Sequence, residues 1–270
     1  MRAAVLGSPI AHSLSPVLHT AAYRELGLAD WSYTAIECAE AGLPALIAGC
    51  GPDWAGLSLT MPLKRAVLPL LRHTEPLAAD TGAANTVLFT AGGLHGYNTD
   101  VPGIVAALAS VGVTAAPGAT VLGAGGTACA ALAALREMGM PEVTVLVRDE
   151  ARADDLLAAA SRLGIAVDLR PFSTGLRSGD LLISTVPAGA ADIFAERSVE
   201  PLARQLAVLD VVYHPWPTPL ALAAAKAGVP VASGFDLLLY QAAGQVELMT
   251  GHQAPLASMR AAGEAALARR

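Results

Sequence analysis

The chain has 270 residues, of which 54% are hydrophobic and 15% are charged, and its formal net charge is −6. Its length and composition predict one large or two modest folded domains and exclude a disordered chain. The acidic balance and the scattered basic residues argue against nucleic acid or an anionic membrane as the main partner.

Three cysteines, Cys38, Cys50 and Cys129, lack the spacing of a zinc site or a disulfide framework. They predict no metal and favour a reduced, cytoplasmic setting.

Residues 101–135 carry no charge, and a membrane-spanning helix is the alternative for so long an apolar run. Prolines and glycines interrupt the run repeatedly, so two buried elements around a glycine-rich turn explain it better. The apolar start of the chain is too short and too soon broken for a signal peptide.

Residues 1–100 predict strands mixed with helices. Strands are expected at 3–6, 31–37 and 56–60, helices at 15–26, 43–48 and 64–71, and a hairpin at 85–90 and 94–97. Ser15 is expected to cap the first helix, because Pro16 follows it at the position where a helix best tolerates proline.

From residue 101 onward, strands and helices alternate. Strands are expected at 120–122, 143–147, around 167, and at 181–185, 207–212 and 230–233, with helices at 104–111, from the glycine turn to 138, near 151–163 and from 235 onward. Such alternation implies a parallel sheet with helices on both faces.

A glycine-rich loop, Gly123-Ala124-Gly125-Gly126-Thr127-Ala128, joins a predicted strand to a predicted helix and fits G-x-G-x-x-A. In such a loop the first glycine permits a tight turn, and the second lets the backbone approach a pyrophosphate. The helix that follows offers free N–H groups to phosphate oxygens. The context favours nucleotide binding over a structural turn, which remains the alternative.

The strand after this loop ends at Val147, Arg148 and Asp149 follow it directly, and Arg152 comes one turn later. Two cations at this position suit the 2′-phosphate of NADP. Asp149 would favour NAD if it bonded the ribose 2′-hydroxyl. The two arginines favour NADP, and a solvated loop is the structural alternative.

Only Lys64 and Lys226 are lysines among 17 basic side chains. A lysine can lose its proton when buried and do acid/base work, whereas an arginine stays charged. Lys64 follows a predicted strand and is the candidate for that role. Lys226 is expected near a helix C-terminus, where a cation is favourable.

Further polar residues stand at predicted strand ends and helix starts. Ser13 and Ser15 bracket a helix start, where hydroxyls and free N–H groups can bind a carboxylate. Asn85 and the triplet 98–100 flank the hairpin, where turn formation is the structural alternative. Gln241 and Gln245 are four residues apart on the final predicted helix and share one face of it.

Taken together, these segments resemble the shikimate dehydrogenase family over nearly the whole chain and in the family's motif order. Residues 7–16 resemble its substrate-carboxylate segment, residues 59–64 resemble the segment with its catalytic lysine, and Tyr213 precedes a similar TPL run. Three positions depart from the family pattern, namely Ser58 for a common Asn, 147–149 for Asn-Arg-Thr/Ser and 184–187 for Asn-Ala-Thr.

The resemblance implies two sets of site residues. Its implied catalytic residues are Lys64 and Asp100. Substrate contacts are implied at Ser13, Ser15, Thr60, Lys64, Asn85, Asp100, Tyr213 and Gln241. NADP contacts are implied at Gly123, Ala124, Gly125, Gly126, Thr127, Arg148, Arg152, Thr185, Val211 and Gly234.

The implied fold is α/β with two domains and a cleft between them. Residues 1–100 and 235–270 would form the substrate domain with a mixed sheet, and residues 101–234 a Rossmann-like NADP-binding domain. The implied activity is reversible NADP-dependent reduction of 3-dehydroshikimate to shikimate by a cytoplasmic monomer or homodimer, in the pathway to chorismate and the aromatic amino acids. The alternatives are an NAD-dependent quinate/shikimate dehydrogenase, an aminoshikimate dehydrogenase and a non-catalytic ligand-binding relative.

Overall fold

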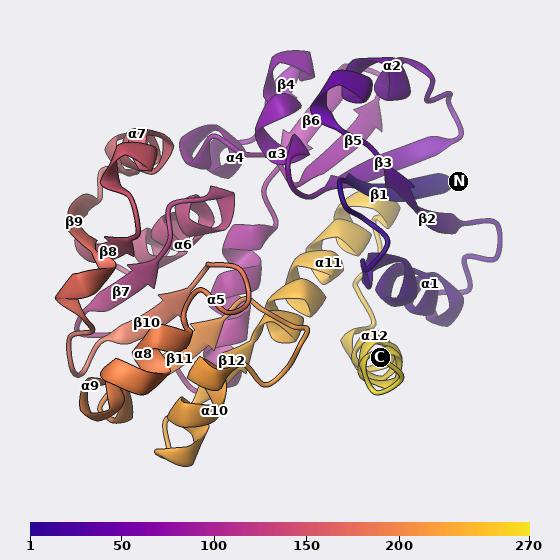
Figure 1. The fold of residues 1–270 in the computed structure, drawn as a ribbon. Helices are drawn as coiled ribbons and strands as arrows, with labels where there is room; N and C mark the ends of the chain where they lie inside the picture. The colour runs from indigo at the N-terminus through magenta and orange to yellow at the C-terminus, as the bar shows by residue number, and fades with distance from the viewer. The chain divides into compact units, whose positions relative to one another are not determined.

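The computed structural model describes residues 1–270, which form two compact units (Figure 1). Unit 1 comprises Met1–Thr99 and Leu238–Arg270, and unit 2 comprises Asp100–Leu237. Helix α11 (Gly234–Thr250) gives its first turn to unit 2 and the rest to unit 1. The functional domains expected from the sequence, divided after residues 100 and 234, stay a prediction.

Unit 1 contains the mixed sheet that was expected. Its strands are β1 (Arg2–Gly7), β2 (Ser32–Glu37), β3 (Trp54–Leu59), β4 (His73–Thr74), β5 (Thr86–Thr90) and β6 (Gly93–Tyr97), in the order β2-β1-β3-β5-β6-β4. Strands β1, β2 and β3 run parallel, whereas β5 is antiparallel to both β3 and β6. Strand β3 is buried along its whole length and β1 nearly so, as expected of central strands covered on both faces.

Short helices surround this sheet. They are α1 (Ser15–Glu25), α2 (Leu43–Ala48), α3 (Leu63–Ala66), α4 (Pro76–Thr81) and α12 (Leu256–Leu267), with 3₁₀ turns η1 (Glu40–Gly42) and η2 (Leu68–Leu70). Helix α12 packs alongside α1. The core beneath them includes the fully buried Leu6, Leu57 and Leu63, each of which contributes about 1.5–3 kcal/mol by leaving water.

Two sequence expectations in unit 1 are wrong in detail. The helix expected at 64–71 stops at Ala66, and a separate 3₁₀ turn contains Pro69, whose ring and missing N–H disfavour a continuous helix. Ser15 does not cap α1, because it is the first helical residue and Leu14 occupies the cap. The Ser13 Oγ accepts from the Ser15 N–H at 3.2 Å instead.

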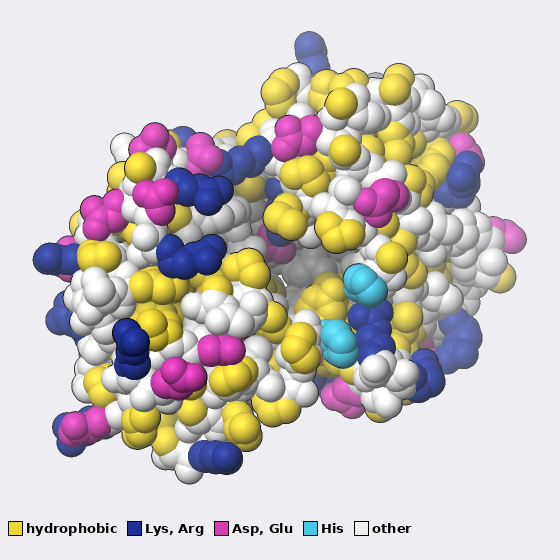
Figure 2. Space-filling model, viewed as in Figure 1, with side chains coloured by type: hydrophobic (Ala, Val, Ile, Leu, Met, Phe, Trp, Pro, Cys, Tyr) yellow, Lys and Arg dark blue, Asp and Glu magenta, His cyan; other side chains and the backbone are white.

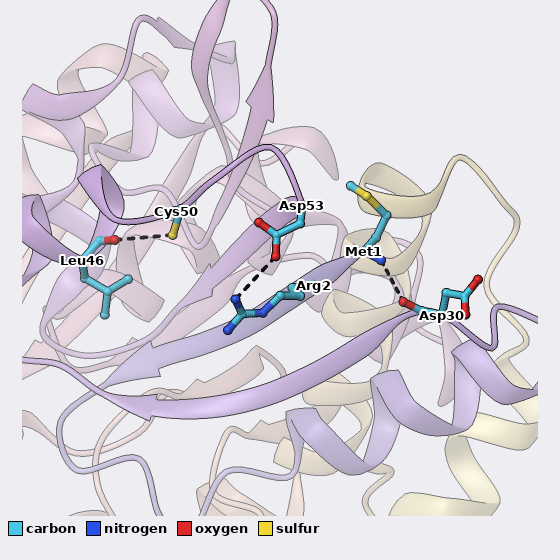
Figure 3. A network of polar contacts seen from close by, with 6 residues as sticks. All are labelled: Met1, Arg2, Asp30, Leu46, Cys50 and Asp53. Carbon is cyan, nitrogen blue, oxygen red and sulfur yellow. Dashed lines mark hydrogen bonds and ion pairs between the residues drawn. The ribbon is translucent and has the colours of Figure 1, made fainter.

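Polar contacts within unit 1 hold the first two residues of the chain in place (Figure 3). The Met1 amino group donates to the Asp30 carbonyl at 2.8 Å, and Arg2 Nη1 lies 3.5 Å from Asp53 Oδ2. The Arg2 guanidinium also covers the Trp54 ring, 4.5 Å from its centroid. Because the ion pair is exposed, it adds at most about 1 kcal/mol to stability.

Unit 2 contains the parallel sheet that was expected. Its strands are β7 (Ala119–Leu122), β8 (Glu142–Val147), β9 (Ala166–Pro171), β10 (Leu181–Ser184), β11 (Ala207–Asp210) and β12 (Val231–Ser233), in the order β12-β11-β10-β7-β8-β9. Every neighbouring pair is parallel. Strands β8 and β9 continue from β7 in one direction and β10 to β12 in the other, which creates a topological switch point between β7 and β10.

The helices of unit 2 form two groups. They are α5 (Asp100–Ser110), α6 (Gly126–Glu137) and α7 (Asp154–Leu163) in one group, and α8 (Asp192–Arg197), α9 (Val199–Ala203) and α10 (Pro219–Lys226) in the other; the 3₁₀ turns are η3 (Glu150–Arg152) and η4 (Phe172–Thr174). The groups lie on opposite faces of the sheet (Figure 1). Connections between parallel strands are right-handed. Because the strand order runs in opposite directions from the switch point, the connecting helices fall on opposite faces of the sheet.

Two surface properties bear on the possible partners. None of the helices combines the length and the apolar composition that crossing a bilayer requires. Cationic and anionic side chains are interspersed over the visible face rather than gathered in a field of one sign (Figure 2).

A buried histidine in unit 1 predicts acid sensitivity. His19 is fully buried and stacks on Tyr33 with ring centroids 3.8 Å apart, and burial lowers its pKa from 6.5 to about 3. Because the folded pKa lies below the unfolded one, the unfolded state binds more protons between these values, and stability falls as pH drops from 6.5 towards 3. The expected slope approaches about 1.4 kcal/mol per pH unit.

Urea unfolding at pH 7 and pH 5 measures this loss in the wild type and in His19→Gln, which lacks the titrating ring. The wild type is expected to lose about 2 kcal/mol more than the variant. Equal losses in the two chains would show that another group carries the acid sensitivity.

Candidate active site

The glycine-rich loop follows β7 at the carboxyl edge of the parallel sheet and opens α6. Gly123 has φ +101°, and a Cβ added to it would lie 2.9 Å from Thr185 Oγ1, so both backbone and space require glycine there. A Cβ added at Gly125 or Gly126 would meet no atom within 4 Å. The loop thus leaves open space beside the N-terminus of α6, which fits a pyrophosphate on backbone N–H groups.

Three other expected cofactor residues lie at the same edge of this sheet. Thr185 follows β10, and its Oγ1 donates to the Leu122 carbonyl at 2.7 Å, which holds it at the switch point. Val211 follows β11, and a Cβ added to Gly234 would overlap its carbonyl oxygen. Segments distant in the chain therefore meet where doubly wound sheets bind their ligands. Ala124 and Thr127 complete the loop and are both half-buried.

The end of β8 carries the residues that were expected to select the cofactor. Arg148 and Arg152 are both exposed. Asp149 Oδ1 accepts from the Ala151 N–H at 3.1 Å and so caps the 3₁₀ turn that contains Arg152. Because the Asp149 carboxylate caps its own turn, the two exposed guanidinium groups are the features of this loop that suit a 2′-phosphate.

In unit 1, the turns after β1 and β3 lie against each other. The Thr60 N–H donates to the Leu6 carbonyl at 2.9 Å, and a Cβ added at Gly7 would overlap the Thr60 methyl group. The turn after β1 leads into Ser13, which is half-buried, and Ser15, which is buried. The turn after β3 leads into α3.

Lys64 lies in the single turn of α3 and is half-buried. Its carbonyl accepts from the Ala84 N–H at 2.8 Å, which holds this turn against the residue that precedes Asn85. Lys226, the other lysine, is exposed in the last turn of α10, where it complements the helix dipole as expected.

A buried polar cluster joins Asn85, Thr99 and Gln241. Asn85 Nδ2 donates to Thr99 Oγ1 at 2.9 Å and to Gln241 Oε1 at 3.3 Å, and its Oδ1 accepts from the Thr99 N–H at 2.8 Å. Asp100 directly follows Thr99, begins α5 and is 6% exposed. Residues far apart in the sequence are thus held together by amide hydrogen bonds.

Tyr213 lies in the segment between β11 and α10. The buried carboxylate of Asp210 accepts hydrogen bonds from both ends of this segment. Asp210 is 1% exposed, accepts from the Val212 N–H at 3.3 Å and from Thr218 Oγ1 at 2.6 Å, and burial raises its pKa. Thr218 in turn caps α10 by accepting from the Ala221 N–H. The role of Asp210 was not predicted from the sequence, although an acid that ends an apolar strand was a usable signal.

A glycine loop at the switch point of a parallel sheet defines unit 2 as a Rossmann-like dinucleotide-binding fold. Unit 1 adds a mixed sheet that gathers serine, threonine, amide and lysine side chains. No group of three His, Cys, Asp or Glu side chains comes together as a metal site would require. The fold and these residues therefore define the class of protein: a dinucleotide-binding α/β protein that has a second, polar site in unit 1.

Comparisons with known proteins narrow this class to one family. Family models match residues 5–87 (shikimate dehydrogenase substrate binding domain), 107–213 (shikimate/quinate 5-dehydrogenase) and 234–262 (shikimate 5′-dehydrogenase C-terminal domain). A curated NADP(+) shikimate dehydrogenase of Halobacterium salinarum is 40% identical over 266 residues, which cover 97% of this chain and 98% of that protein. The chain belongs to the shikimate dehydrogenase family.

Solved structures agree with this family over both units. Shikimate dehydrogenase of Mycobacterium tuberculosis is 44% identical with a TM-score of 0.89, covering 98% of this chain and 99% of that one. The enzyme of Thermus thermophilus, in complex with NADP(H) and shikimate, is 36% identical with a TM-score of 0.85 and the same coverage.

Proposed function

We propose that this chain is an NADP-dependent oxidoreductase that interconverts 3-dehydroshikimate and shikimate in the pathway to chorismate and the aromatic amino acids. The observation that carries the proposal is similarity across both units to a structure that holds NADP(H) and shikimate. A cytoplasmic setting and a monomeric or homodimeric state remain predictions from the sequence.

In this reaction, shikimate and NADP⁺ give 3-dehydroshikimate, NADPH and a proton. NADP supplies the hydride acceptor when it is bound at the loop of Gly123–Thr127. The hydroxyl being oxidised must lose its proton as the C–H bond breaks, so it needs a positioned base. Lys64 is the proposed base and, in the reverse direction, the acid, with Asp100 as the second catalytic residue.

The remaining residues of the proposed site bind and orient the substrate. Ser13 and Ser15 are assigned to its carboxylate, because they lie at the N-terminus of α1, where N–H groups favour an anion. The assigned ring contacts are Thr60, Asn85, Asp100, Tyr213 and Gln241. The buried cluster of Asn85, Thr99 and Gln241 supports these assignments, because its hydrogen bonds orient amides that can read hydroxyl groups.

Steady-state kinetics with shikimate and quinate, each against NADP⁺ and NAD⁺, test the proposal. The highest kcat/KM is expected for shikimate with NADP⁺. If quinate with NAD⁺ gave the highest value, the chain would be the NAD-dependent quinate/shikimate enzyme. Binding of shikimate without any formation of reduced nicotinamide would identify a non-catalytic relative.

Replacing Arg148 by alanine is expected to change cofactor preference. The variant loses a charge-assisted contact to the 2′-phosphate, so KM for NADP⁺ rises about tenfold while KM for NAD⁺ stays nearly constant. Arg204→Ala is the matched control, because Arg204 is an exposed cation at the end of α9 that pairs with Glu200. A parallel rise in both KM values for Arg148→Ala would show that Arg148 does not select the phosphate.

A further inference from the structure

Gln245 is a buried amide in unit 1 that the proposed function does not yet use. It lies on α11 one turn after Gln241 and is 1% exposed. Its Oε1 accepts from Ser58 Oγ at 2.8 Å and lies 3.3 Å from His19 Nε2. Its Nε2 donates to the Asn85 carbonyl at 3.2 Å and to Thr86 Oγ1 at 3.1 Å. The amide therefore uses its full hydrogen-bonding capacity inside the protein.

The partners leave one orientation for this amide. The backbone carbonyl of Asn85 can only accept, so the amide nitrogen of Gln245 must face it. The amide oxygen then faces Ser58 and His19, and His19 must donate from Nε2 as a neutral ring. Burial that lowers the His19 pKa to about 3 maintains this neutral form at working pH.

From Gln245 the hydrogen bonds continue to the proposed ring contacts. Thr86 Oγ1, which accepts from Gln245, donates in turn to Asn85 Oδ1 at 3.0 Å. Asn85 Nδ2 donates to Gln241 Oε1 at 3.3 Å. The backbone N–H of Thr99 and the backbone carbonyl of Leu238 already fix the orientations of the Asn85 and Gln241 amides. Gln245 instead holds the position of Asn85, through its backbone carbonyl and through Thr86.

On its other side, Gln245 leads towards the proposed carboxylate contacts. Tyr33 donates from its hydroxyl to Ser58 Oγ at 2.6 Å, and this bond leaves the Ser58 proton for Gln245. His19, whose Nε2 lies 3.3 Å from Gln245 Oε1, is one turn after Ser15 on α1. One buried network thus connects the helix that carries Ser15, which is assigned to the substrate carboxylate, with the amides assigned to the substrate ring.

We propose that Gln245 is a positioning residue for shikimate, which holds Asn85 and Gln241 in register with Ser15 without touching the substrate itself. The proposal rests on the function proposed above. A buried polar network is costly unless every member is satisfied, and an apolar side chain would fill this part of α11 without that cost. The saturated hydrogen bonds of Gln245 therefore indicate a role in orientation.

Gln245→Met tests the proposal, because methionine has a similar length but cannot make these hydrogen bonds. KM for shikimate is expected to rise about tenfold, since the Asn85 carbonyl and Thr86 lose the hydrogen bonds that hold Asn85 in position. KM for NADP⁺ is expected to stay within about twofold, because the glycine loop belongs to unit 2. Ser58→Ala, a smaller change on the Tyr33 side, is expected to raise KM for shikimate by a smaller factor.

Val246→Ala is the matched control, because Val246 is fully buried on the same helix and its side chain cannot hydrogen-bond. It is expected to lower Tm while leaving KM for shikimate unchanged. If Gln245→Met lowered Tm and left KM for shikimate as in Val246→Ala, Gln245 would be structural only. An inactive wild type would instead refute the proposed function, and the positioning role with it.

Discussion

Replacing Lys64 by alanine is expected to lower kcat for shikimate oxidation by roughly 10²–10⁴-fold, the range that a positioned general acid/base contributes. The structure gives this lysine a half-buried place in a one-turn helix held beside Asn85. Because α3 keeps its backbone hydrogen bonds in the variant, Tm is expected to change little. Rapid mixing with saturating shikimate and NADP⁺ measures the rate of the first turnover directly.

Lys226→Ala supplies the matched control, since Lys226 is exposed at the end of α10 and its replacement is expected to leave kcat unchanged. A Lys64→Ala chain that turned over within a few-fold of the wild type would remove Lys64 from the mechanism. A large loss of Tm in that chain would instead assign Lys64 a structural role.

Two glycines of one loop are expected to respond in opposite ways. At Gly125, where an added Cβ meets open space, valine is expected to leave Tm unchanged and to raise KM for NADP⁺ at least about 100-fold by blocking the pyrophosphate. At Gly123, where φ is +101° and Thr185 crowds the added atom, alanine is expected to lower stability by about 1–3 kcal/mol.

Thermal unfolding and cofactor titration of the two variants separate these effects. Unchanged NADP⁺ binding in Gly125→Val would mean that the loop is a structural turn, the alternative that the sequence left open. Undiminished stability in Gly123→Ala would contradict the backbone requirement at that turn.

The parallel sheet of unit 2 and its glycine loop could be predicted because their signals are local. Apolar strands such as residues 143–147 alternate with helices, and Gly123 and Gly125 stand where a strand meets a helix. The helix expected at 64–71 was wrong because the apolar pattern continued through Pro69, although the backbone could not. Helix α4 was missed because a glutamate, Glu75, caps it in place of a usual capping residue.

The buried network around Gln245 could be predicted least. Its spacing from Gln241 placed both on one helix face, but nothing local indicated that His19, Ser58 and Thr86 would surround it. These residues come from a helix and two strands that only the tertiary fold brings together. Side-chain hydrogen bonds of this range leave no periodic signature, so the sequence suggested binding residues without the residues that orient them.

In the proposed reaction, the hydride passes directly from shikimate to NADP⁺. Shikimate that carries deuterium at the carbon of the oxidised hydroxyl, incubated with the wild type and NADP⁺, is expected to yield 3-dehydroshikimate and deuterated NADPH in equal amounts. Mass spectrometry of both products measures the transfer. Reduced cofactor without deuterium, or deuterium released to water, would contradict the proposed reaction.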